Sequence, residues 1–185
     1  MATITWYATY DLDPFHPIKS ETKPLTIQVV ALDWKWLFIY PEQEIATVNF
    51  VQFPAGTPIH FELSADNSPM NSFWIPQLSG QIYSMTGMAT MLNIMADGPG
   101  TYVGRAAEIN GEGFADMTFT VHSCSPADFD DWVSYVKQSP LHLTGSTYHE
   151  LAARSVNHPV VLYSNVEKNI FHDIVMQPNE PTPEP

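Results

Sequence analysis

The sequence predicts a mostly-β domain, a sandwich or a barrel, followed by a helical extension. The first observation behind this is a series of short β-branched and aromatic runs between residues 24 and 122, separated by Pro and Gly turns. The second is a change in the apolar pattern after Cys124, from alternation to the three-and-four spacing of an amphipathic helix. Many short strands with turns between them are typical of sandwiches and barrels.

Six strands are expected, at residues 25–32, 34–40, 46–53, 57–63, 91–95 and 117–122. The last is the clearest example. Met117, Phe119 and Val121 alternate there with polar residues, which predicts one buried face and one face in water.

Three helices are expected in the extension. The first has Ser125 as its N-cap and Pro126 at the first helical position, and its apolar stripe consists of Phe129, Trp132, Val133 and Val136. A second helix is expected at about 147–155. A third would begin at Ser164, with Glu167 completing a capping box, and would place Val166, Ile170 and Ile174 on one stripe.

Composition excludes several classes of function. The 185 residues suit one domain, and a net charge of -13 from 20 acidic and 7 basic residues opposes binding to nucleic acid or to anionic lipid. The single cysteine, Cys124, cannot form an intrachain disulfide. No apolar run approaches the ~20 residues of a membrane span, and no signal peptide is visible, so the chain as written is expected to be soluble.

Three blocks of sequence carry a family resemblance. They are DWKWLFIYPEQEIATVN at 33–49, NSFWIPQLSGQIYSMTGM at 71–88, and YVGRAAEINGEGFADM at 102–117. Together they resemble subunit II of the haem-copper respiratory oxidases, in the quinol-oxidising, cytochrome bo-type branch. The resemblance implies a cupredoxin-like Greek-key β-sandwich with a C-terminal helical extension.

Family members that oxidise cytochrome c hold a binuclear copper centre, CuA, whose ligands lie in the third block, with one further histidine at the start of the second. The corresponding positions here are Asn71, Ala106, Glu108, Asn110, Phe114 and Met117. A copper pair needs thiolate and imidazole ligands, and alanine, asparagine and phenylalanine supply neither. The resemblance therefore implies a vestigial site, with no metal, cofactor or catalytic residue in this chain.

The resemblance also implies a place in a larger assembly. This would be the extracytoplasmic domain of a ubiquinol oxidase, capping subunit I of a proton-pumping complex that oxidises quinol and reduces oxygen to water. Subunit I would hold the haems and copper. The domain would face the periplasm at a bacterial inner membrane, attached through N-terminal helices that this sequence lacks. Its expected divisions are 1–23, a lead-in; 24–124, the cupredoxin domain; 125–177, the helical extension; and 178–185, a disordered tail.

Candidate interface residues follow from the same resemblance. Glu108 and the aromatic residues Trp34 and Trp36 would contact subunit I, and Trp6, Tyr7 and Tyr10 would lie near the membrane interface. Each has a structural alternative. Glu108 could be bonded within its own loop, and the aromatic residues could belong to the core or its edge.

Two alternatives from other classes remain. Clustered thioethers bind Cu(I), so a soluble periplasmic Met-rich copper-binding protein could use Met70, Met85, Met88, Met91, Met95 and Met117, although thioethers also fill cores. A cupredoxin-like carrier without metal is the other. A blue-copper site is excluded, since His142 and Met176 lie too far beyond Cys124. The seven histidines show no zinc spacing, and hydrolase motifs are absent.

Overall fold

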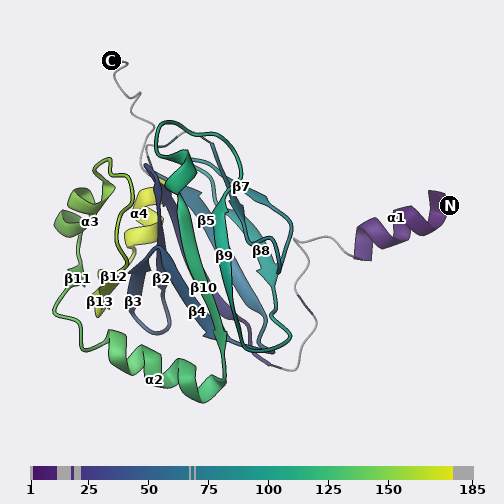
Figure 1. Ribbon diagram of the computed structural model, residues 1–185, viewed down its shortest axis with the longest axis horizontal. Coiled ribbons are helices and arrows are strands. Elements are labelled where there is room, and N and C mark those ends of the chain that lie inside the picture. Colours follow the sequence, from purple (N-terminus) through teal and green to yellow (C-terminus); the bar gives the residue numbers. More distant parts are fainter. Residues whose placement is uncertain (1, 12–17, 19–21, 67, 69, 177–185) are drawn as a thin grey trace.

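The computed structural model describes residues 2–11, 18, 22–66, 68 and 70–176, and its body is a sandwich of two β-sheets (Figure 1). In spatial order, the six-stranded sheet consists of β12 (Val161–Tyr163), β3 (Ile45–Val48), β2 (Lys35–Tyr40), β1 (Leu25–Leu32), β5 (Ile59–Ala65) and β8 (Thr90–Ile94). The five-stranded sheet consists of β4 (Phe50–Pro54), β10 (Thr118–Cys124), β9 (Gly100–Ala106), β6 (Asn71–Trp74) and β7 (Ile82–Ser84).

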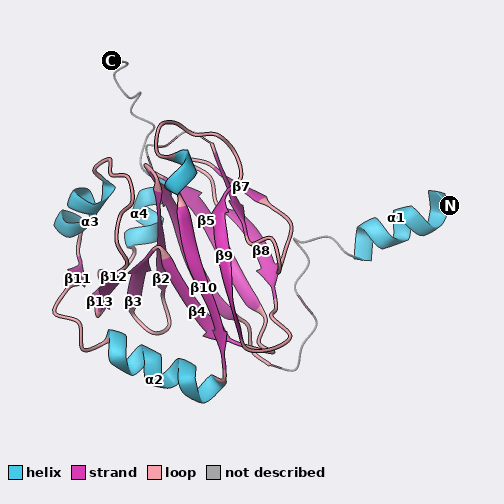
Figure 2. Ribbon diagram, in the orientation of Figure 1, coloured by secondary structure: helices cyan, strands magenta, loops and turns pink. Residues whose placement is uncertain are grey.

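The remaining elements lie outside the two sheets, as Figure 2 shows by colour. They are the helices α1 (Ala2–Asp11), α2 (Pro126–Val136), α3 (Gly145–Ala152) and α4 (Ile170–Met176), the short 3-10 helix η1 (Phe114–Asp116), and a parallel pair of strands, β11 (His142–Leu143) and β13 (Asn165–Val166). Two pairings inside the main sheets are also parallel, β1 with β5 and β4 with β10. This arrangement confirms the predicted mostly-β sandwich.

An aromatic core fills the space between the two sheets. Trp36 and Phe38 from one sheet meet Phe73 and Phe119 from the other, and all four are almost completely buried. The rings of Phe73 and Phe119 stack at 5.0 Å, and Trp36 meets both of them edge-on. Because successive side chains of a strand point to opposite faces, these residues alternate with others that need a different partner.

That partner is the C-terminal extension. Val30 of β1 and Leu37 and Ile39 of β2 point away from the sandwich and are buried in a second core. Its other side is supplied by the extension, with Tyr148 of α3 and Phe171 of α4 among the buried residues. All six residues of β2 are therefore buried, because both faces of the strand are covered.

The expected strand at 46–53 is in fact two strands in different sheets. The chain changes sheet at Asn49, whose φ of 55° lies in the left-handed region that asparagine tolerates. Its side chain bonds across the break, since Oδ1 accepts from the backbone N–H of Trp36 at 2.9 Å. The sequence did not reveal this break, because β-branched and aromatic residues continue through it. The sequence analysis also did not predict β6, β7 and β9, which are short or contain glycine.

The first two expected helices are present. In α2 the Ser125 hydroxyl accepts the N–H of Asp128 at 3.2 Å, as the N-cap pattern predicts. The second, α3, begins at Gly145 and ends at Ala152, earlier than the expected 147–155. Its cap is Thr144, which forms a reciprocal capping box with Thr147.

The third expected helix does not begin at Ser164. Residues 165–166 form β13 instead, and α4 starts at Ile170. The Ser164 hydroxyl bonds the carbonyl of Leu141, and the Glu167 carboxylate accepts the N–H of Gly145 at 2.7 Å, so neither side chain forms the predicted cap. The extension is thus a mixture of helices and strands, and β12 joins the six-stranded sheet.

The N-terminal helix α1 lies apart from the sandwich (Figure 1). Ile4, Trp6 and Tyr7 are all more than 60% exposed, at 71%, 69% and 63%. In the part of the chain that the structure describes, no helix is long and apolar enough to span a bilayer. The side chain of Tyr10 and the expected disordered tail at 178–185 lie outside the described residues.

Candidate functional site: the loop end of the sandwich

One end of the sandwich gathers most of the site residues predicted from the sequence. We call it the loop end and define it as the β1–β2 turn at 33–34, the segment leading into β6, and the loop at 106–117. The 3-10 helix η1 belongs to this loop and marks the loop end at the top of Figure 1. The loop follows β9 and precedes β10, so two adjacent strands fix its ends.

Three of the six predicted site residues meet in a buried polar cluster. The Nδ2 group of Asn110 donates to Oδ1 of Asn71 and also to Sδ of Met117, the latter at 3.1 Å. Asn71 in turn donates to the Ser68 hydroxyl at 3.0 Å. Asn71 and Met117 are completely buried and Asn110 is 7% exposed, although residues 71 and 110 are far apart in sequence.

Ala106 and Phe114 lie beside this cluster. Ala106 is buried, and its N–H donates to the Met117 carbonyl at 3.0 Å, while the N–H of Ala107 donates to the carbonyl of Ser72. Phe114 is half-buried and packs against the aromatic core. These backbone bonds hold the loop against β6 and β10, so five of the six positions share one small region.

Glycines in this region make room for aromatic rings. A Cβ on Gly113 would come within 2.3 Å of Cγ of Trp34, and one on Gly111 within 3.0 Å of the same indole. A Cβ on Gly104 would meet Phe119 at 2.0 Å. The glycine-rich spacing of the third sequence block is therefore explained by packing, with Trp34 lying directly on the loop backbone.

The interface candidates have different surroundings. Glu108 is exposed and Trp34 is half-buried, whereas Trp36 is completely buried between Phe73 and Phe119. Trp36 is thus a core residue and presents no side chain to a partner, contrary to the expectation. Sequence reasoning overlooked Ile109, which is 78% exposed beside Glu108. Its position between the polar residues Glu108 and Asn110, in a loop, could have indicated from the sequence that it is exposed.

The side chains of the cluster do not fit a copper centre. Copper ligands must offer lone pairs from thiolate, imidazole or thioether groups. Met117 has a thioether, but its sulfur accepts a hydrogen bond from an amide N–H of Asn110. Of the described residues, no group of three or more His, Cys, Asp or Glu could hold a metal ion.

The methionines proposed for Cu(I) do not share one environment. Met117 is completely buried in the polar cluster, whereas Met70, Met88 and Met91 are 44%, 48% and 43% exposed. Met91 lies within β8 and pairs with Glu62 of the neighbouring strand. The distribution favours separate packing and surface roles over a single thioether site.

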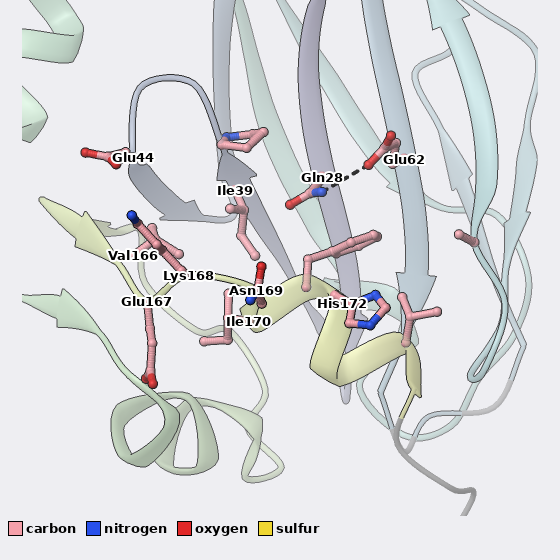
Figure 3. A pocket seen from close by; sticks show the side chains of 14 residues that line it. Gln28, Ile39, Glu44, Glu62, Val166, Glu167, Lys168, Asn169, Ile170 and His172 are labelled. Carbon is pink, nitrogen blue, oxygen red and sulfur yellow. Dashed lines mark hydrogen bonds between the residues drawn. The ribbon is translucent and has the colours of Figure 1, made fainter.

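A groove of about 520 Å³ lies elsewhere, between the outer face of the six-stranded sheet and α4 (Figure 3). Gln28 and Glu62 form its sheet side and are joined by a 3.0 Å hydrogen bond. His172 lines the opposite side from α4. Ile39 and Ile170 give it an apolar floor. It contains none of the predicted site residues, so its size does not make it the candidate site.

The sequence analysis did not identify two buried charged residues at the β1–β2 turn and beside it. Lys35 is completely buried, and Asp33 is nearly so at its side chain, which is 11% exposed. Charged residues inside the aromatic run DWKW were a signal, because an ionised side chain is seldom buried without specific partners.

Comparison with known proteins gives the fold and the family. The periplasmic domain of subunit II of cytochrome oxidase from Bradyrhizobium japonicum superimposes with a TM-score of 0.60 over 65% of this chain and 96% of that one, at 18% identity. A family model described as the COX Aromatic Rich Motif matches residues 137–182. The chain is also 51% identical, over 92% of its length, to cytochrome bo(3) ubiquinol oxidase subunit 2 from Pseudomonas putida.

This chain belongs to the subunit II family of the haem-copper oxidases. A second relative of this family, ubiquinol oxidase subunit 2 from Acetobacter aceti, is 49% identical over 97% of the chain. The chain covers 54% and 58% of these two proteins, so it spans little more than half the length of the curated relatives it matches. The aromatic-rich motif of the family corresponds to the extension that forms the second core.

Proposed function

We propose that this chain is the extracytoplasmic domain of subunit II in a ubiquinol oxidase. It lies over subunit I, which carries the haems and copper, and the complex oxidises quinol, reduces oxygen to water and moves protons. The domain faces the periplasm of a bacterial inner membrane. The names of the two ubiquinol oxidase relatives and the identity along almost the whole chain support this proposal.

The observation that carries the proposal is the amide and thioether cluster at the loop end. The side-chain N–H groups of Asn110 donate hydrogen bonds to Asn71 and Met117. A copper relay would instead require side chains at these positions that donate electron pairs to the metal. A domain built this way cannot accept electrons through its own metal. Electrons from quinol therefore enter the complex at another subunit, and the role of this domain is structural.

The loop end is the surface that meets subunit I. Ile109 is 78% exposed, and Met70, which lies in the segment before β6, is 44% exposed. Apolar side chains with an acidic neighbour such as Glu108 are typical of the centre and rim of a protein interface. The exposed aromatic residues of α1, Trp6 and Tyr7, lie at the lipid headgroups.

Copper loading tests the metal-free part of the proposal. The purified chain, incubated with copper and dialysed, is expected to be colourless and to retain no stoichiometric metal. Metal analysis and a visible absorption spectrum make the measurement. Thiolate-to-copper absorption bands with about one copper per chain would contradict it.

Affinity purification from the membranes of the native organism tests the assembly. The tagged protein is expected to bring down a haem protein with quinol-dependent oxygen uptake, whereas the isolated chain is expected to show no uptake. An Ile109→Glu variant should reduce the recovered haem, because it buries a charge in the interface. A Val160→Glu variant is the matched control, since Val160 is 52% exposed in the extension, outside the loop end.

A further inference from the structure

The β1–β2 turn holds a tryptophan in a conformation that normally favours glycine. Leu32 pairs with Lys35, so Asp33 and Trp34 form a two-residue turn, and Trp34 has a φ of 65°. For a bulky side chain this is a strained position that persists only where the surroundings impose it. The neighbouring residues must therefore hold the turn in place.

One side of the turn is held by Lys35. Its Nζ group donates to the carbonyl of Ala153 at 2.7 Å and to the hydroxyl of Ser155 at 2.6 Å, both in the segment after α3. Burial lowers the pKa of this amine, while the nearby Asp33 carboxylate opposes the shift. A completely buried ammonium group needs such partners. Lys35 therefore cannot move away from residues 153–155 without leaving its charge without hydrogen-bond acceptors.

The same segment also holds the other side of the turn. Nε of Arg154 lies 2.8 Å from Oδ2 of Asp33, in a pair whose carboxylate is largely buried and whose guanidinium is exposed. Residues 153–155 therefore contact the residues before and after Trp34. The exposed pair is the weaker contact, because solvent screens it.

The indole of Trp34 transmits this position to the 106–117 loop. The ring lies so close to the backbone at Gly111 and Gly113 that neither residue could carry a Cβ without displacement. These glycines precede η1, and their carbonyl groups accept hydrogen bonds from its backbone: the N–H of Phe114 donates to Gly111 and the N–H of Asp116 donates to Gly113. A shift of the ring would therefore first disturb the hydrogen bonds that the amides of Phe114 and Asp116 donate.

We propose that Lys35 is a positioning residue, through which the C-terminal extension fixes the Trp34 turn and, through the indole, the conformation of the 106–117 loop. The extension thus has a role beyond covering the second core: it sets the shape of a loop that lies on the other side of the turn. This coupling is internal to the chain and does not depend on the proposed docking to subunit I.

Hydrogen exchange of the purified chain tests the coupling. Lys35→Met is expected to fold, since an apolar side chain of similar length can replace a buried charge. We expect exchange at the amides of Phe114, Asp116 and Met117 to become about tenfold faster, while the β5 amides stay unchanged. Lys137→Met, which removes an exposed lysine at the end of α2, is the matched control and should alter neither region.

A double-mutant cycle separates coupling from general loss of stability. Trp34→Ala removes the ring, and in that background Lys35→Met should produce no further acceleration at η1. Ser155→Ala should give a smaller change in the same amides, and it keeps the test available if Lys35→Met does not fold. Equal acceleration at η1 and β5, or additive effects in the double variant, would refute the proposal.

Discussion

Two buried polar clusters lie at opposite ends of β2 and β10, and they are built differently. At the loop end, Asn110 bonds Asn71 and Met117 through side chains alone, and its Oδ1 has no hydrogen-bond partner among the described residues. At the far end, the Tyr40 hydroxyl donates to the Gln52 carbonyl and accepts from the Gln52 N–H, both at 2.9 Å.

The far cluster is tied to the strands themselves. The Gln52 side chain also donates to Sγ of Cys124 at 3.3 Å and lies 3.2 Å from Nδ1 of His122, so its amide is paired on both sides. It joins β2, β4 and β10 and stabilises the sandwich. The loop-end cluster joins residues of loops and strand ends, and one of its buried acceptors is unpaired. This difference indicates that the loop-end side chains can be exchanged at little cost, whereas those at the far end cannot.

The largest expected effect comes from exchanging the loop-end side chains for copper ligands. Asn71→His, Ala106→Cys, Asn110→Cys and Phe114→His combined should convert a colourless protein into a deeply coloured one with about two copper ions per chain. The reason is that the backbone already brings these positions together. Metal analysis and absorption spectra make the measurement. The variant that retains Asn71 should bind copper less well, and failure of the complete variant to bind it would show that the positions do not converge.

Gly104→Ala is expected to destabilise the protein strongly. The new methyl group would overlap Phe119, which stacks on Phe73 in the aromatic core, and overpacking of this kind costs about 3 kcal/mol. Urea unfolding measures the change in the free energy of unfolding. Gly98→Ala is the control, because nothing lies within 4 Å of its Cβ position. Equal losses in the two variants would rule out packing as the cause.

Tyr40→Phe and Asn110→Ala compare the two clusters directly. Tyr40→Phe leaves buried backbone groups of Gln52 without their partner and should cost about 2 kcal/mol. Asn110→Ala loses bonds but also removes an unpaired buried carbonyl, so its cost should stay below about 1 kcal/mol. Urea denaturation with unchanged m-values makes the comparison. The reverse order would show that the loop-end cluster is the structural one.

Alkaline pH should destabilise the protein through its buried tyrosines. Burial raises the pKa of Tyr40 and of Tyr148, and the hydroxyl of Tyr148 also donates to the Asp66 carboxylate. Both tyrosines stay protonated in the fold, so their contribution is complete below about pH 10 and is lost as unfolded tyrosines ionise above it. Each tyrosine should lower the free energy of unfolding by about 1.4 kcal/mol per pH unit there.

Tyr148→Phe isolates one of these contributions. Its free energy of unfolding, measured by urea between about pH 9 and 11, should fall less steeply than that of the parent protein. Lys35 acts in the opposite direction, because burial lowers its pKa and the unfolded chain then binds the extra proton. A parallel pH dependence in Tyr148→Phe and the parent would exclude this tyrosine as a source.

The sequence predicted what depends on periodicity and local capping. Alternation predicted β10, and Ser125 with Pro126 predicted the start of α2. It did not predict the break at Asn49 or the failure of Ser164 to cap a helix, because both depend on partners distant in sequence. Trp36 was misassigned to an interface for a similar reason. An aromatic residue in a strand faces the core or the surface according to register, and the neighbouring sheet sets that register.

At the candidate site, the resemblance gave the positions and the structure gave their contacts. Asn71, Asn110 and Met117 converge, yet no sequence pattern reveals that an amide donates to a thioether sulfur. The role of Lys35 was equally hidden, since its partners, Ala153 and Ser155, lie in a stretch without a motif. Contacts between distant segments are the part of the site that composition and spacing do not encode.

The pairing of β12 with β3 has a consequence for protein handling. Tyr163 pairs with Ala46 and Val161 with Val48, so the extension occupies a sheet edge as well as an apolar face. A chain cut after Cys124 would expose the backbone N–H and C=O groups of β3 next to uncovered Leu37 and Ile39. Such an edge recruits strands from other molecules. The sandwich alone is therefore expected to aggregate during expression. By covering this edge and this apolar face, the extension prevents such association.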